Sequence, residues 1–69
     1  MSEHIYKTIE VVGVSPKSEE DAIRNAIETV TKTVRHVGWF EVTESRGVVI
    51  DNKVAKFQVA LKVGFRLEH

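Results

Sequence analysis

The last quarter of the sequence alternates between apolar and polar side chains, and this pattern restricts the fold more than any other feature. Every second residue there is apolar, and the set comprises Ala55, Phe57, Val59, Leu61, Val63, Phe65 and Leu67. Because successive side chains of a strand point to opposite faces, the pattern predicts a long strand with one buried face. A sheet of this kind needs a second layer to cover that face.

A helix is predicted to supply that layer. Ser15 and Ser18 are rival N-caps before three acidic residues, which favour the positive end of the helix dipole. Apolar residues then recur at steps of three and four, and they are Ile23, Ala26, Ile27, Val30, Val34 and Val37. We expect a helix of about five turns, with Lys32, Arg35 and His36 in its last turn and Gly38 as its C-terminal cap.

Two further strands complete the prediction. Residues 5–12 are rich in β-branched side chains and should form a first strand that Gly13 ends. A second strand should begin at Trp39, carry a bulge at Arg46-Gly47, and reach the last strand through a turn at residues 51–53. We predict an α+β fold of order β-α-β-β, a single domain over residues 1–69. Its three-stranded antiparallel or mixed sheet would wrap one helix, with the last strand in the middle.

The chain has 69 residues and no cysteine, which leaves few ways to stabilise so small a core. Disulfides and thiolate zinc sites are excluded, and the histidines His4, His36 and His69 have no ligand spacing, so we expect no metal. Self-association is the remaining source of stability, and we therefore expect a homo-oligomer.

Charge and hydropathy exclude two classes of partner. Ten basic and ten acidic residues cancel, so we expect no nucleic acid. No apolar run reaches membrane-spanning length, so we expect no membrane partner. Residues 1–4 lack a signal-peptide layout, and a cytoplasmic location is expected. The ending Leu67-Glu68-His69 is either native or the start of an expression tag.

Because side chains alternate between the two faces of a strand, Trp39 and Gln58 should lie on the face that the helix does not cover. Glu41, Thr43 and Ser45 of the second strand should share that face. The simpler interpretation is an aromatic residue packed by a neighbouring subunit. The sharper one is a stacking platform beside an amide that both donates and accepts hydrogen bonds, which suits a planar heteroaromatic ligand.

Several segments resemble the dodecin family in order and spacing. They are residues 4–16, 38–42, 46–47, 55–59 and 62–67, which together extend over nearly the whole chain. The resemblance implies a hollow homododecamer that binds flavins in pairs at subunit interfaces. It implies storage and photoprotection of FMN or riboflavin, with no enzymatic activity.

The resemblance also implies the site residues. Trp39 matches the tryptophan that stacks on the flavin, and Gln58 matches the glutamine that hydrogen-bonds the isoalloxazine edge. Arg46 falls where similar bacterial members carry an arginine near the polar tail of the ligand, which would suit a phosphate. Coenzyme A is a possible second ligand, for which Lys7 and Arg66 are candidate basic residues.

Two other function classes compete with flavin binding. An enzyme would need a nucleophile or an acid–base pair in a cleft. Ser15 and Ser18 are better explained as caps, Glu41 and Glu44 should face opposite sides of their strand, and His36 fits a structural role at a helix end. We expect no catalytic residue. An oligomeric interaction module with no small ligand remains the alternative.

Overall fold

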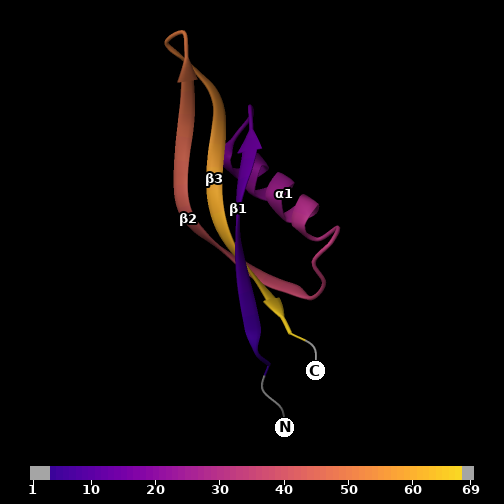
Figure 1. Ribbon diagram of the computed structural model, residues 1–69. Coiled ribbons are helices and arrows are strands. Elements are labelled where there is room, and N and C mark those ends of the chain that lie inside the picture. The colour runs from indigo at the N-terminus through magenta and orange to yellow at the C-terminus, as the bar shows by residue number, and fades with distance from the viewer. Residues whose placement is uncertain (1–3, 68–69) are drawn as a thin grey trace.

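The computed structural model describes residues 4–67, and its elements follow the predicted order. They are β1 (Tyr6–Ser15), α1 (Glu19–Val30), β2 (Val37–Ile50) and β3 (Lys53–Arg66). β3 lies in the middle of the sheet and pairs antiparallel with both β1 and β2 (Figure 1). The predicted α+β fold, including its central last strand, is confirmed. Of the ending Leu67-Glu68-His69, whose origin the sequence leaves open, Glu68 and His69 lie outside the described residues.

The core lies between α1 and the face of the sheet that α1 covers. Its buried apolar residues are Ala22, Ala26 and Val30 from the helix and Val59, Leu61 and Val63 from β3. The alternation in the last strand therefore identifies its buried face correctly. Ile23 and Ile27 pack at the margin of this core, and Ala22, which the predicted stripe omits, is fully buried.

Gly13 explains why Ala22 lies so deep. The prediction that Gly13 ends the first strand is wrong, because β1 continues through it to Ser15. A methyl group at Gly13 would lie 2.9 Å from the carbonyl carbon of Ala22 and 3.0 Å from Cβ of Ala26. The missing side chain thus lets the helix backbone approach the sheet directly.

Ser18 is the N-cap of α1, and the prediction for its start is confirmed. The Ser18 side chain accepts a hydrogen bond from the N–H of Asp21 at 3.0 Å. Ser15, the rival cap, is fully buried and donates instead to the Asp21 carboxylate at 2.7 Å. The two serines therefore hold the same aspartate from opposite sides, which anchors the helix start to the end of β1.

The predicted length of the helix is wrong. α1 ends at Val30 after 12 residues, and Thr31 is its C-cap. The N–H groups of Lys32 and Thr33 reach back only three residues, to the carbonyls of Thr29 and Val30, so the regular α-helical pattern gives way to turns there. The β-branched residues after Val30 have modest helix propensity. Val37 and Gly38 belong to β2, and the left-handed residue between the elements is His36, with φ 64°.

The sheet is irregular at three positions, none of which is the predicted bulge at Arg46-Gly47. Arg46 and Gly47 pair in register with Gln58 and Phe57. The register instead shifts between Val37 and Trp39, between Val42 and Glu44, and between Val48 and Val49. Each bulge increases local twist, and together they accompany the curved course of β2 and β3 (Figure 1).

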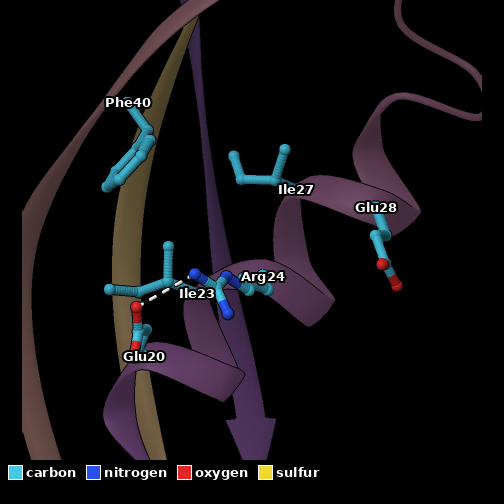
Figure 2. Close-up of a pocket in the computed structure, with 6 residues that line it drawn as sticks. All are labelled: Glu20, Ile23, Arg24, Ile27, Glu28 and Phe40. Carbon is cyan, nitrogen blue, oxygen red and sulfur yellow. Dashed lines mark hydrogen bonds and ion pairs between the residues drawn. The ribbon is translucent and has the colours of Figure 1, made fainter.

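α1 covers only part of its side of the sheet. It packs mainly against β1 and β3, so Phe40 and Val42 of β2 share the helix side but remain 47% and 44% exposed. α1 therefore leaves both side chains largely uncovered. Between Phe40 and the helix residues Ile23 and Ile27 runs an open groove, with the Glu20–Arg24 ion pair on its rim (Figure 2).

The β2–β3 hairpin extends past the start of α1 (Figure 1). Its turn has Asp51 and Asn52 in the left-handed region, with φ 53° and 64°, as a two-residue hairpin turn requires. The predicted turn is therefore confirmed. No helix within residues 4–67 is long and apolar enough to cross a membrane.

Candidate functional site

The outer face is defined here as the sheet face opposite α1. Residues paired directly across an antiparallel sheet share a face. Trp39 pairs with Gly64, and Arg46 pairs with Gln58, while the alternate β3 residues Val59, Leu61 and Val63 are buried under α1. Trp39, Gln58 and Arg46 therefore all lie on the outer face, where the sequence places the first two.

Trp39 lies flat on the sheet at one end of the outer face. A methyl group at Gly64 would lie 2.7 Å from Cδ2 of the Trp39 indole and closer still to Cε2 and Cζ2. The ring of Tyr6 stands beside the indole, with centroids 6.3 Å apart and planes tilted by 45°. Trp39 remains 42% exposed, so one face of the ring is against the sheet and the other is available for stacking.

Arg46 and Gln58 form the second part of the site. The Arg46 guanidinium donates to Oε1 of Gln58 at 3.2 Å and forms an ion pair with Glu44. A hollow of the outer face opens beside them over Ala60, with Val12 and Thr43 among its lining residues. This arrangement offers a cation, an amide and a recess for a polar or anionic group.

The two parts do not meet within one chain. Trp39 is opposite Gly64 and Arg46 is opposite Gln58, and these two β3 residues are six positions apart. At a strand rise of about 3.4 Å per residue, the separation is about 20 Å. A single aromatic ring system that stacks on Trp39 is therefore too short to reach Gln58 of the same chain.

The bulge at Thr43 decides which β2 side chains join the outer face. Before the bulge the odd-numbered residues of β2 lie on the outer face, and after it the even-numbered residues do. Glu44 and Arg46 therefore lie on the outer face, and Ser45 lies on the helix side. The Ser45 hydroxyl accordingly donates to the carboxylate of Glu19 on α1. The expectation that Ser45 shares the face of Trp39 is wrong.

The same bulge corrects the expected positions of the two glutamates. Glu41 pairs with Lys62 and Glu44 pairs with Ala60, so both carboxylates lie on the outer face rather than on opposite sides. Glu44 is engaged by Arg46, which gives it an electrostatic partner on its own strand.

The other candidate residues are dispersed. Lys7 is opposite Phe65 and Arg66 is opposite Tyr6, so these two basic residues lie on opposite faces of the sheet. His36 follows the helix by several residues instead of ending it, and its carbonyl accepts from the N–H of Arg66 at 3.0 Å. Within residues 4–67, no group of three or more His, Asp or Glu could hold a metal ion.

Gly64 and Tyr6 are the members of the site that sequence reasoning missed. The signal was available, because a glycine inside an otherwise regular strand marks a close approach of another group. In the alternation of the last strand, Gly64 counts only as one of the residues on the polar face. Only the bulge at Gly38, which sets the register of Trp39, identifies the group that approaches it.

Comparison with known proteins gives consistent matches over the whole chain. A family model described as Dodecin matches residues 5–68. The curated dodecin of Thermus thermophilus is 48% identical over 64 residues, which cover 93% of each chain. The structure of dodecin from Streptomyces coelicolor matches with a TM-score of 0.94 and 51% identity, covering 100% of this chain and 99% of that one. Dodecin from Streptomyces davaonensis matches with a TM-score of 0.94 and 44% identity, covering 99% and 100%.

Proposed function

The chain belongs to the dodecin family, and on that premise we propose that it is a non-enzymatic flavin-binding protein that stores flavin in a homododecamer. The observation that carries the proposal is the orientation of the Trp39 indole. Its indole lies flat on the outer face with one side open, next to the small residue Gly64. A planar ring held in this way is suited to stack on an isoalloxazine ring.

The roles of the other two residues follow from their chemistry. Gln58 can donate and accept hydrogen bonds at the edge of the isoalloxazine ring, and Arg46 can bind a phosphate at the end of the ribityl chain. The separation of Trp39 from Gln58 within one chain favours a site at a subunit interface, where one copy supplies the indole and another the amide.

Photoprotection is the proposed purpose of the stack. An indole in contact with an excited isoalloxazine ring can quench it by electron transfer, after which the electron returns and no net reaction occurs. No acid–base pair is needed for this role. FMN and riboflavin both carry the isoalloxazine ring, and we propose one of these two flavins as the ligand.

A flavin titration tests the proposal. Trp39 is the only tryptophan, so its emission reports on one place in each chain. We expect riboflavin and FMN to quench the emission of Trp39, and their own emission to fall in parallel. Trp39→Ala should lose most of the binding while far-UV circular dichroism stays unchanged. Lys32→Ala, which shortens an exposed side chain after α1, is the control and should bind normally.

The titration separates flavin binding from the alternative interaction module. In that alternative, neither wild type nor the control variant binds flavin, and Trp39→Ala disrupts the oligomer. Assembled wild-type protein that remains unquenched throughout the titration would therefore overturn the proposal.

A further inference from the structure

Gly64 lies on the outer face yet is buried, and the group that covers it is the indole of Trp39. A methyl group at Gly64 would lie 2.7 Å from Cδ2 of the indole and closer to two further ring atoms. Real side chains do not tolerate such distances, so the ring rests on the backbone of β3 in a space that only glycine leaves open.

A second glycine fixes the residue beside the indole. A methyl group at Gly38 would lie 3.2 Å from Cε2 of Tyr6, whose ring stands 6.3 Å from that of Trp39. Gly38 is the extra residue of the first β2 bulge, directly before Trp39. The indole is therefore supported from below by Gly64 and flanked by Tyr6.

We infer that Gly64 is a positioning residue for ligand stacking, because it lets the indole lie parallel to the sheet with a single exposed face. This inference rests on the proposed flavin binding. A ring already held in its stacking orientation loses less conformational freedom when a ligand binds, and that preorganisation strengthens binding. Gly64 itself need not touch the ligand.

The structure also predicts that this role can be separated from folding. At Gly64 the obstructing atoms belong to one partly exposed side chain, which can swing away. At Gly13 the obstructing atoms include the helix backbone, which cannot. Gly64→Ala should therefore keep the fold and displace the indole.

The experiment compares Gly64→Ala with Gly47→Ala. Gly47 is a matched control in the adjacent strand, because a methyl group there would meet one atom within van der Waals range, the Lys56 carbonyl oxygen at 3.9 Å. We expect Gly64→Ala to weaken FMN and riboflavin binding by at least about tenfold. Without flavin it should change the near-UV circular dichroism of Trp39 and increase acrylamide quenching of its emission. Gly47→Ala should change none of these.

Each outcome has one meaning. If wild type binds flavin and Gly64→Ala binds it equally, the inference is overturned and the proposed function stands. If wild type fails to bind flavin, the proposed function fails. The Trp39 signals measured without ligand still test whether Gly64 positions the indole. Unchanged Trp39 signals in Gly64→Ala overturn the inference in either case.

A double variant covers the case in which Gly64→Ala fails to fold. Removing the ring removes the steric conflict, so Gly64→Ala in the Trp39→Ala background should fold as well as Trp39→Ala alone. That result supports the inference. If the added methyl group prevents folding even without the indole, the conflict lies elsewhere and the inference is overturned.

Discussion

At the scale of single residues, the two sides of the sheet respond differently to substitution. On the helix side, side chains interlock in a small core. On the outer face they are partly exposed and contact each other in pairs, such as Trp39 with Tyr6 and Arg46 with Gln58. Substitutions on the helix side should therefore change stability, and substitutions on the outer face should change binding.

Leu61 tests the helix side. It is fully buried at the centre of the core, and Leu61→Ala should lower the free energy of unfolding by about 2–5 kcal/mol, because it removes apolar contacts and leaves a cavity. Urea denaturation at a fixed protein concentration measures the loss, with Lys32→Ala as the exposed control. Equal midpoints for the two variants would contradict the assigned core.

Arg46 tests the outer face. Arg46→Ala should weaken FMN binding roughly twofold to fivefold, as expected for a partly exposed ion pair of about 0.5–1 kcal/mol, and should largely spare riboflavin. The difference should shrink as salt rises. Isothermal titration with both ligands measures it, and an equal loss for FMN and riboflavin would remove the phosphate role.

A substitution of Glu44 should change FMN binding in the direction opposite to that of Arg46→Ala. In the free chain Glu44 holds the Arg46 guanidinium, so Glu44→Gln should free that group and strengthen FMN binding while leaving riboflavin binding unchanged. Weaker FMN binding by Glu44→Gln would indicate that the ion pair positions Arg46 for the ligand rather than competing with it.

At the scale of elements, the sequence predicts what depends on period and misses what depends on local backbone geometry. The two-residue period of β3 and the apolar spacing around Ile23 and Ile27 determine the strand, the helix and their shared core. The apolar residues Val34 and Val37 continue the helical spacing by coincidence. The helix ends before them because the chain must turn back to pair Val37 with Phe65, and this tertiary constraint has no local sequence signal.

The candidate site shows the same division. Trp39 precedes the bulge at Thr43, so simple alternation places it on the correct face. Arg46 follows the bulge, and its face could be learned only from the pairing with Gln58. A bulge adds one residue without changing composition, so alternation alone cannot locate it.

The hairpin turn offers a test at this scale. Asn52 has φ 64°, a conformation that costs a side chain with a branched Cβ about 1–2 kcal/mol. Asn52→Gly should therefore preserve or raise stability, and Asn52→Val should lower it by that amount. Thermal unfolding of the two variants at one concentration measures the difference. Equal stability of the two would show that the turn does not constrain the hairpin.

At the scale of the whole molecule, the chain is more extended than a compact domain of its length. Its radius of gyration is 14.4 Å, against about 11 Å for a compact domain of this length. The hairpin carries Val49, Ile50 and Val54 at exposures of 65%, 55% and 62%. Apolar side chains are also exposed in the groove between Phe40 and the helix (Figure 2), and such surfaces are typical of subunit interfaces.

We therefore predict an assembly much larger than a dimer, with twelve copies as the expected number. Multi-angle light scattering at micromolar concentration measures the mass directly. Trp39→Ala should keep this mass if its main role is to bind flavin. A monomeric or dimeric mass for the wild-type protein would contradict the prediction.

The bulge at Thr43 lets Trp39 and Arg46 share the outer face although an odd number of positions separates them along β2. Because Val42 pairs with Leu61 and Glu44 pairs with Ala60, deletion of Thr43 would leave a regular ladder in which Arg46 keeps its face. The extra residue therefore contributes local twist to β2 rather than the direction of its later side chains. A redesign that shortens β2 at this position should preserve the outer face and change the curvature of the hairpin.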